Sequence, residues 1–230
     1  MSTFDDANAS TMDTYQQIAS HYAEQHTLAR MPPFWHQLLE CFVAALHESP
    51  LYQVRSSLPV LDVGCGHGRD ALLLAQHQLT VLAIDLSDAM LDEARTRCQG
   101  QPDAERIAFR QMDMRTLDLP ENACAGLWVS ASFLHIPKHE NTAVLKELLR
   151  VLVPGGPIML IVKECDVEEP ERYEIHPVSG TPRFFARYRG GELWELLEQA
   201  GIQLLEMRAT RDTRSSTVSR WLGALGIKKG

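Results

Sequence analysis

The stretch VLDVGCGHGR at residues 60–69 joins an apolar, strand-forming run to three glycines at alternate positions. The run contains a carboxylate, Asp62, and Gly64, Gly66 and Gly68 follow it. Glycine adopts backbone conformations that are closed to other residues, and it lets a ligand approach the main chain closely. A loop of this kind between a strand and a helix start therefore predicts a binding site.

The spacing of these glycines argues against the two common phosphate-binding loops. A dinucleotide loop of the G-x-G-x-x-G type needs glycine where Arg69 stands, and no G-K-S or G-K-T follows, as a P-loop requires. A tight turn alone rarely needs three alternating glycines. We therefore expect the loop to hold part of a ligand other than a phosphate chain.

Apolar segments and segments with helical periodicity alternate along most of the chain. This order predicts a mainly parallel sheet with helices on both faces. Ligands of such sheets bind beyond the carboxyl ends of the strands. The predicted strands are 59–64, 80–85, 106–113, 124–132, 157–164, 202–210 and 216–229, and the predicted helices between them are 69–78, 87–100, 141–156 and 191–201.

Two further helices are predicted before the first strand, at 12–26 and 34–49. We expect residues 1–57 to form an N-terminal helical lid and residues 58–230 to form the core. Residues 165–189 interrupt the alternation with charged residues, proline and glycine, and we expect them to cover the carboxyl edge of the sheet as an insertion.

The composition bounds the class of protein. With 230 residues the chain is long enough for one large domain with its own core. Its five cysteines are scattered and none is spaced C-x-x-C, which predicts a cytoplasmic protein without a disulfide framework. No apolar run reaches the ~20 residues that span a bilayer, and the polar, acidic start is unlike a signal peptide. No histidine or cysteine pair has zinc-site spacing, so we expect no metal.

Charge is distributed unevenly along the chain. The formal net charge is -8, yet residues 183–230 carry nine Lys and Arg against five Asp and Glu. A basic segment on an acidic body can favour an anionic substrate, or it can be a solvated surface. Both interpretations stay open at this point.

Two acids end the strands that follow the glycine loop. Asp85 closes 80–85, where a carboxylate can accept hydrogen bonds from both hydroxyls of a ribose. Asp113 closes the next strand and can accept a hydrogen bond from an adenine amino group. Either acid alone is explained equally well as a cap or turn residue. The glycine loop, Asp85 and Asp113 follow three successive predicted strands, and together they indicate a nucleoside site.

Taken together, these features resemble the class I S-adenosylmethionine-dependent methyltransferase family, and the flanking segments resemble its small bacterial members. The resemblance implies a Rossmann-like, doubly wound sheet of seven strands with the last strand antiparallel, and S-adenosylmethionine as cofactor. The matching segments are VLDVGCGHGRDA (60–71), VLAIDLSDAMLDEAR (81–95), FRQMDMRTLDLP (109–120), AGLWVSASFLHIP (125–137) and LLRVLVPGGPIMLIVKE (148–164), with YQQIASHYAEQH (15–26) and PRFFARYRGGELWELLEQAG (182–201) as flanks.

The resemblance also implies roles for individual residues. The loop backbone would lie against the methionine part and the ribose of the cofactor, Asp62 would orient the methionine amino group, and Arg69 would meet its carboxylate. Tyr15 and Tyr22 would belong to a lid over the cofactor, and Ser130 would lie near the methyl group. The expected cofactor-binding residues are Tyr15, Tyr22, Asp62, Gly64, Cys65, Gly66, Gly68, Arg69, Asp85, Leu86, Met90, Met112, Asp113, Met114 and Ser130.

Transfer of a methyl group from a sulfonium is an in-line displacement, so alignment of the reacting atoms is the main requirement. A base is needed only when the acceptor keeps its proton. His135, just past the fourth strand, is the candidate catalytic base, and capping of the next helix or a cofactor contact is the alternative. Arginine among aromatic residues in the cover can bind an anionic or planar acceptor. The expected substrate-binding residues are Phe133, His135, Lys163, Glu164, Arg183, Phe185, Arg187 and Tyr188.

Three functions fit this sequence. A methyltransferase for a small-molecule acceptor fits best, because little beyond the core exists except a lid and a short cover. An RNA or protein methyltransferase is supported only by the basic C-terminal segment, since no dense basic stripe is present. A protein that binds the cofactor without transferring the methyl group is the third. We expect no membrane partner.

Overall fold

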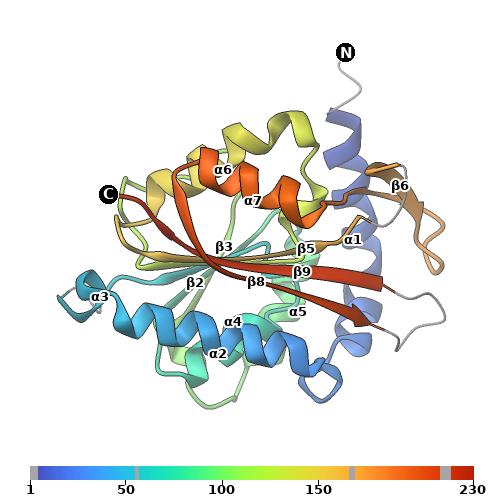
Figure 1. Cartoon of the computed structure of the whole chain (residues 1–230). Coiled ribbons are helices and arrows are strands. Elements are labelled where there is room, and N and C mark those ends of the chain that lie inside the picture. The colour runs from blue at the N-terminus through green and yellow to red at the C-terminus, as the bar shows by residue number, and fades with distance from the viewer. Residues whose placement is uncertain (1–4, 55–56, 166–168, 213–218) are drawn as a thin grey trace.

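A computed structural model of the 230-residue chain describes residues 5–54, 57–165, 169–212 and 219–230. Its centre is a seven-stranded sheet in the order β3-β2-β1-β4-β5-β9-β8 (Figure 1). The strands are β1 (Val60–Val63), β2 (Val81–Asp85), β3 (Ile107–Gln111), β4 (Gly126–Ser130), β5 (Pro157–Lys163), β8 (Ile202–Asp212) and β9 (Ser219–Lys228).

The strand directions confirm the predicted fold class. Strands β1 to β5 pair in parallel, whereas β9 lies antiparallel between β5 and β8. The strand order reverses at β1, whose neighbours are β2 on one side and β4 on the other. A crevice opens beyond the carboxyl ends of the strands at such a reversal, and ligands bind there.

Helices cover both faces of the sheet, with α2 and α4 on one face and α6 and α7 on the other (Figure 1). Successive side chains of a strand point to opposite faces, so Val60 packs with α2 and α4 while Leu61 and Val63 pack in the cluster that contains α6 and α7. The helices are α2 (Pro33–Glu48), α3 (Pro50–Val54), α4 (Arg69–Gln76), α5 (Asp88–Cys98), α6 (Asn141–Val151) and α7 (Gly190–Gln199), with short 3-10 turns at Leu28–Arg30, Ala104–Arg106, Phe133–His135 and Lys138–Glu140.

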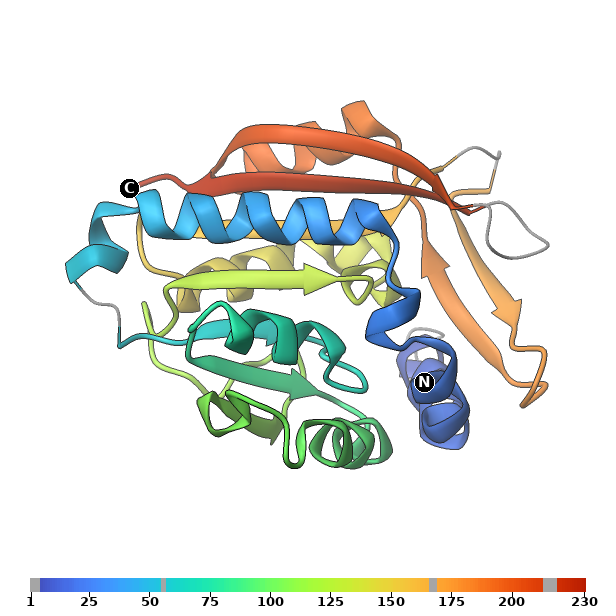
Figure 2. The same cartoon turned by 90° about the horizontal axis from the view of Figure 1, so that it is seen from below.

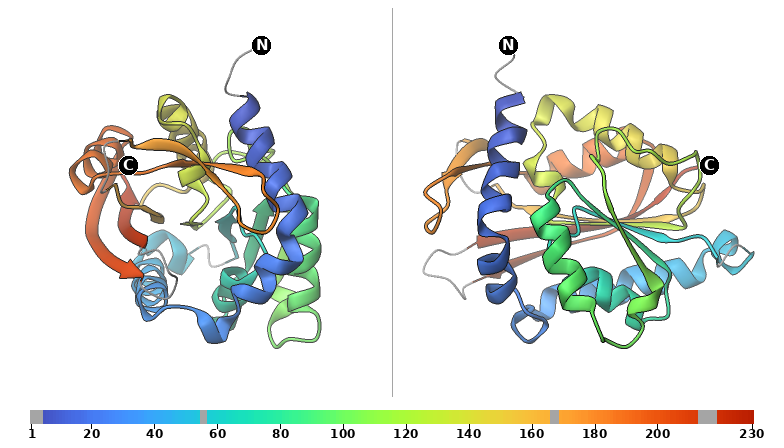
Figure 3. Two further views of the ribbon diagram at one scale, coloured as in Figure 1. Left: turned by 90° about the vertical axis from the view of Figure 1, so that its right-hand side faces the viewer. Right: turned by 180° about the vertical axis from the view of Figure 1, so that it is seen from behind.

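Helix α1 (Asp5–Gln25) crosses the carboxyl edge of the sheet (Figure 3). It packs against α5 and β7, and we call it the lid helix. The helix begins at Asp5, seven residues earlier than predicted, because Ser10 and Thr14 bind the backbone of the segment beside them. That tertiary contact could not be seen in the helix pattern alone.

The predicted cover forms a two-stranded antiparallel hairpin of β6 (Glu171–Ile175) and β7 (Pro182–Ala186). We call it the cover hairpin. It projects beside the lid helix at the same end of the sheet (Figure 2). We propose that the described part of this segment, residues 165 and 169–189, acts as the insertion over the binding edge, and residues 166–168 lie outside the described residues.

Helix α2 packs differently from the lid helix. It buries eight side chains, and its Phe42 ring lies 5.5 Å from the ring of Trp128 in β4. It is therefore a sheet-covering helix although it lies within 1–57. We propose that the lid consists of α1 alone.

Candidate active site

The glycine loop between β1 and α4 has a left-handed backbone at each of its glycines. At Gly64 φ is +69°, and a Cβ there would lie 2.4 Å from the Cβ of Ser132. At Gly66 φ is +53°, and no atom lies within 4 Å of where a Cβ would be. Gly64 therefore allows close packing of two loops, whereas Gly66 leaves open space at the wall of a cavity.

Asp85, at the end of β2, binds this loop. Its Oδ2 accepts the backbone N–H of Gly66 at 2.8 Å, and its Oδ1 accepts that of Ser87 at 2.9 Å. Burial raises the pKa of Asp85, while the N–H donors of Ser87 and Gly66 act in the opposite direction. A carboxylate oxygen has two acceptor positions, so each oxygen keeps one for a ligand hydroxyl.

Asp62, in β1, has a carboxylate oxygen that lacks a hydrogen-bond partner among the described residues. It is 2% exposed, and among the described residues nothing hydrogen-bonds its buried Oδ2. Burial, together with the nearby carboxylates Asp70 and Asp85, raises its pKa well above the usual value. A buried acceptor of this kind is costly unless a ligand supplies a donor. Asp62 lines the cavity, so a ligand can supply one.

Arg69 and Asp70 form an ion pair at the start of α4. Arg69 Nε donates to Asp70 Oδ1 at 2.7 Å, and Trp128 Nε1 donates to Asp70 Oδ2 at 3.0 Å. Burial would raise the pKa of Asp70, but the pairing with Arg69 outweighs it and the pKa is lowered. Asp70 balances part of the charge of Arg69. Arg69 also lines the cavity, where its guanidinium can still contact a carboxylate of a ligand.

The side of the cavity beyond β2 and β3 is largely apolar. Leu86, Met90, Met112 and Met114 line it, as a flat aromatic base requires. Asp113 also lines it, but its carboxylate is already engaged. It accepts the backbone N–H of Arg115 at 2.9 Å and forms a bidentate pair with the Arg115 guanidinium, from Nε to Oδ1 at 3.2 Å and from Nη2 to Oδ2 at 2.7 Å. The adenine contact expected of Asp113 would require this pair to open.

The lid helix closes the cavity with aromatic rings. Tyr22 stacks on His26 with ring centroids 3.9 Å apart, and it meets His67 of the glycine loop edge to face. His67 hydrogen-bonds the backbone oxygen of His26 at 2.6 Å. Tyr15 lies seven positions earlier on the same face of the helix, and its ring centroid is 5.7 Å from that of Tyr22. The lid is thus bonded directly to the loop that it covers.

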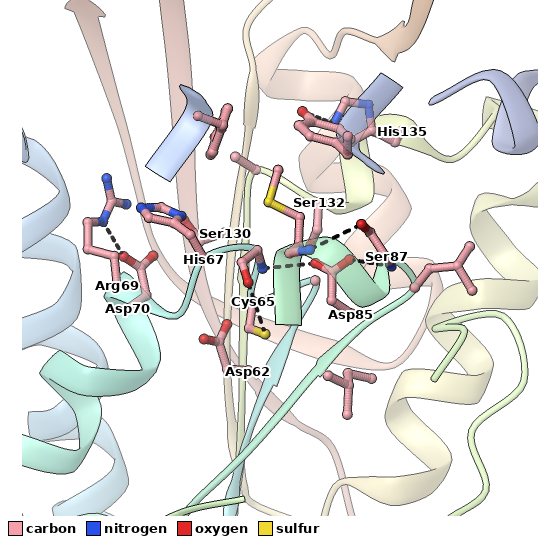
Figure 4. A pocket seen from close by; sticks show the side chains of 18 of the residues that line it. Asp62, Cys65, His67, Arg69, Asp70, Asp85, Ser87, Ser130, Ser132 and His135 are labelled. Atoms are coloured by element: carbon pink, nitrogen blue, oxygen red, sulfur yellow. Dashed lines mark hydrogen bonds and ion pairs between the residues drawn. The ribbon is translucent and has the colours of Figure 1, made fainter. Parts of the chain in front are cut away.

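His135 lies across the cavity from Asp62 and Asp85 (Figure 4). Its Nδ1 bonds the backbone oxygen of Phe184 at 2.7 Å, and its Nε2 bonds the hydroxyl of Tyr15 at 3.0 Å. A carbonyl oxygen only accepts, so Nδ1 carries the proton and Nε2 accepts that of Tyr15. Burial lowers the pKa of His135 to about 3. The imidazole is therefore neutral, with both nitrogens already bonded.

Two tryptophans line the cavity near the end of β4. Trp35 Nε1 donates to Ser130 Oγ at 3.2 Å, and its ring meets Trp221 of β9 edge to face at 5.1 Å. Trp221 Nε1 is buried and has no hydrogen-bond partner among the described residues. It offers a donor to a ligand on this side of the cavity.

The cavity brings together nearly all of the residues expected to bind the cofactor. Gly68 is the exception, because a Cβ there would lie 2.8 Å from the Cβ of Ala94, and the residue faces α5. The residues that do line the cavity are Tyr15, Tyr22, Asp62, Gly64, Cys65, Gly66, Arg69, Asp85, Leu86, Met90, Met112, Asp113, Met114 and Ser130.

The residues expected to bind the substrate are placed less favourably, and His135 alone among them lines the cavity. Phe133, Phe185 and Tyr188 are 0%, 4% and 0% exposed and pack in the hydrophobic core. Glu164 accepts from Arg220 Nε at 2.7 Å. The remaining three, Lys163, Arg183 and Arg187, lie around the cover hairpin behind the cavity wall.

Sequence reasoning missed several wall residues. His67 and Asp70 flank the predicted loop and helix start, so an acid and an imidazole at those positions were available signals. No sequence signal indicated Trp35 and Trp221, because they are 186 positions apart in the chain and meet only in the folded structure.

Residues 60–156 match a family described as a methyltransferase domain. The match contains the glycine loop, Asp85 and the strand reversal that form the cavity. Residues 60–156 are therefore assigned to a methyltransferase domain, similar to those of class I S-adenosylmethionine-dependent methyltransferases.

Relatives and solved structures agree with this assignment. The chain is 35% identical to trans-aconitate 2-methyltransferase of Methylobacterium nodulans over 130 residues, which is 56% of this chain and 46% of that protein. It is 33% identical over 151 residues to methyltransferase GfsG of Streptomyces halstedii, 64% of this chain and 54% of that protein. These matches span about half the length of either relative.

The fold is shared with the 1,6-didemethyltoxoflavin-N1-methyltransferase of Burkholderia thailandensis. The TM-score is 0.70 at 20% identity, over 100% of this chain and 92% of that one. At this identity the likeness shows a shared fold alone.

No helix in the described part of the chain is both long and apolar enough to cross a membrane. Within those same residues, no three histidine, cysteine or acidic side chains are grouped as a metal ion would require.

Proposed function

We propose that the protein transfers the methyl group of S-adenosylmethionine to a small-molecule acceptor. The observation that carries this proposal is the pair of carboxylates on one side of the cavity. Asp62 presents a buried oxygen without a partner among the described residues, and Asp85 keeps two acceptor positions beside the glycine loop. An amino group at Asp62 and a ribose at Asp85 would satisfy both.

The residues present fit the cofactor on each side. Gly66 leaves room for a ligand against its backbone, Arg69 is placed for a carboxylate, and Leu86 and Met90 border the apolar slot. When bound, S-adenosylmethionine supplies an activated methyl group on a positively charged sulfur. The chain supplies alignment and exclusion of water, which can contribute several kcal/mol and at most ~7–11 kcal/mol.

His135 acts in this scheme as a structural link and not as a base. Its accepting nitrogen is bonded to Tyr15, its other nitrogen to Phe184, and burial opposes protonation. An acceptor that is already deprotonated at neutral pH needs no base. The free methyl acceptor is therefore expected to carry its nucleophile in an ionised or unprotonated form.

A small acceptor is favoured over RNA or protein because the cavity is closed by the lid helix and walled by Trp35 and Trp221. A cytoplasmic location is part of the same proposal and rests on five free cysteines.

Two measurements test the proposal. Calorimetry should show micromolar binding of S-adenosylmethionine and S-adenosylhomocysteine, and a labelled-methyl assay with small molecules extracted from cells should yield a labelled product. If neither cofactor form binds, the proposal fails. If both bind and no labelled product of any size forms, the protein binds the cofactor without transferring its methyl group. A label found only in RNA or protein would replace the small-molecule acceptor.

A further inference from the structure

We propose that the acceptor carries a carboxylate and that Arg183, on the cover hairpin, anchors it. This inference rests on the proposed function, because it names the chemical class of the acceptor for the same cavity.

Arg183 lies opposite Glu174 in the cover hairpin, but among the described residues it forms no ion pair, and its buried Nε has no hydrogen-bond partner. Its Nη1 reaches the hydroxyl of Tyr15 at 3.4 Å, and its guanidinium lies 5.5 Å from the ring of Tyr15 and 5.2 Å from that of Phe185. Nη1 is thus directed at Tyr15, whereas the Nε donor has no partner among the described residues. A guanidinium in this situation suits the two oxygens of a carboxylate.

The neighbouring cations differ from Arg183 because they share a carboxylate of the protein. Glu174 on β6 accepts from Lys163 Nζ at 3.0 Å and Arg172 Nη2 at 3.1 Å, and it also pairs with Arg187. Burial opposes ionisation of Glu174, but Lys163 and Arg187 outweigh it and lower its pKa to about 2. The region thus holds more positive than negative charge, and Arg183 is the member that Glu174 leaves unpaired.

Arg183 stands directly behind the cavity wall. Tyr15, which it contacts, lines the cavity and bonds His135, which also lines it. This wall is opposite the carboxylates assigned to the cofactor (Figure 4). A carboxylate bound at Arg183 would therefore hold the rest of the acceptor in the space between the lid and the end of β4.

A second unpartnered donor supports the same ligand chemistry. Trp221 Nε1 is buried on the cavity wall and can donate only. A carboxylate is an acceptor-only group, so it suits the Arg183 guanidinium, and the Trp221 N–H suits a second acceptor atom of the same ligand. A phosphate dianion matches the site less well, because Glu174 stands beside it and would repel the second charge.

Binding of small carboxylates to the protein saturated with S-adenosylhomocysteine tests the proposal. Calorimetry at constant ionic strength would compare succinate, trans-aconitate and benzoate with inorganic phosphate and with the neutral trimethyl ester of trans-aconitate. We expect at least one carboxylate to bind, and Arg183→Gln to weaken it about 10- to 100-fold through the loss of charge-assisted hydrogen bonds. Arg183→Lys should recover only part of the affinity, because it keeps the charge and loses the planar fork.

Arg172→Gln is the matched control. It removes one positive charge from the same hairpin but leaves Arg183 intact, so we expect less than about a threefold change. Arg183→Gln and Arg172→Gln should both keep the unfolding temperature of the wild type and its affinity for S-adenosylhomocysteine. If Arg183→Gln does not fold, Arg183→Lys is compared with Arg172→Gln instead.

Several results would overturn the carboxylate anchor. These are equal losses in the two glutamine variants, binding of the neutral ester as tight as that of the acid, preferential binding of phosphate, or no carboxylate binding at all. Failure of S-adenosylhomocysteine to bind would instead overturn the proposed function, so the two failures are distinguishable.

Discussion

Asp85 joins two strand ends through one carboxylate, because its Oδ2 accepts from the N–H of Gly66 in the glycine loop and its Oδ1 accepts from the N–H of Ser87 at the start of α5. The loop after β1 and the turn after β2 are thereby held at a fixed separation. The same carboxylate keeps acceptor capacity toward the cavity. A ribose bound there would meet a group that is already positioned.

Asp85→Ala should weaken binding of S-adenosylhomocysteine by about 1–3 kcal/mol, since hydrogen bonds to a buried carboxylate are lost. Calorimetry measures the change. Asp92→Ala is the control, because Asp92 is an exposed residue of α5 that pairs with Arg95 at 2.7 Å, and its loss should change affinity by less than ~0.5 kcal/mol. Equal affinities of the wild type and Asp85→Ala would contradict the ribose assignment.

Asp62→Asn should stabilise the free protein and weaken the complex. An acid whose pKa is raised on folding stabilises the fold at low pH, and this contribution is lost as the pH rises past its ordinary range. At pH 7 the raised pKa of Asp62 therefore opposes folding, and replacing the carboxyl by an amide should raise the free energy of unfolding by at least about 1 kcal/mol. Urea unfolding measures this gain, which should shrink at pH 4.

The cost of Asp62→Asn should be seen in the complex with S-adenosylhomocysteine, whose amino group would lose a carboxylate partner. We expect roughly tenfold weaker binding by calorimetry. A variant that is less stable than the wild type, or that binds equally well, would show that Asp62 has a purely structural role.

Gly66→Ala should weaken binding of S-adenosylhomocysteine more than it weakens the fold. Each L-residue in the left-handed region costs roughly 1–2 kcal/mol. Gly155→Ala is a matched control, because Gly155 also has a positive φ, of +73°, with nothing within 4 Å of a Cβ, but it is remote from the cavity. Both variants should lose similar stability in urea unfolding, and only Gly66→Ala should lose affinity. Equal affinities would place the cofactor away from this loop.

His135 should make stability depend on pH between about 3 and 6.5. Burial lowers its pKa to about 3, whereas histidine in an unfolded chain titrates near 6.5. A depressed pKa contributes stability above pH 6.5 that is lost as the pH falls, at up to ~1.4 kcal/mol per pH unit. Urea unfolding at several pH values should show a shallower slope for His135→Gln than for the wild type.

The control for that experiment is His36→Gln, since His36 is exposed on α2. It should leave the slope unchanged. A wild-type slope that His135→Gln does not reduce would show that His135 titrates normally in the folded protein. The pH profile of the methyl-transfer rate should have the same shape near pH 6.5 in the wild type and in His135→Gln.

Much of the fold could be predicted because local pattern and tertiary environment agree. Apolar runs such as 157–164 are buried on both faces of the sheet, so β5 occupies nearly the predicted residues. The lid helix was predicted too short, because side chains of its first turns donate hydrogen bonds to the backbone of the cover hairpin. Such a contact between residues 10 and 182 leaves no trace in helical periodicity.

The two sides of the site differ in how far they could be predicted. The cofactor side lies on strand ends and one loop, where chain order determines position, and Asp62 and Asp85 line the cavity as expected. The acceptor side depends on which way the hairpin side chains face. Arg183 and Phe185 are two positions apart in β7, so the strand pattern assigns them to the same face. The Phe185 ring is nevertheless buried in the core, and the Arg183 guanidinium lies 5.2 Å from the centre of that ring.

The serines and threonines between the lid helix and the cover hairpin also bear on the order of events. Ser10 and Thr14 bind the backbone of Pro182, Thr11 accepts from the N–H of Phe184, and further along the same helix Gln16 binds Ser87 beside the cofactor wall. One helix thus contacts elements on both sides of the cavity. We expect any outward movement of this helix to expose both sides at the same time, so that donor and acceptor enter before the helix covers either of them.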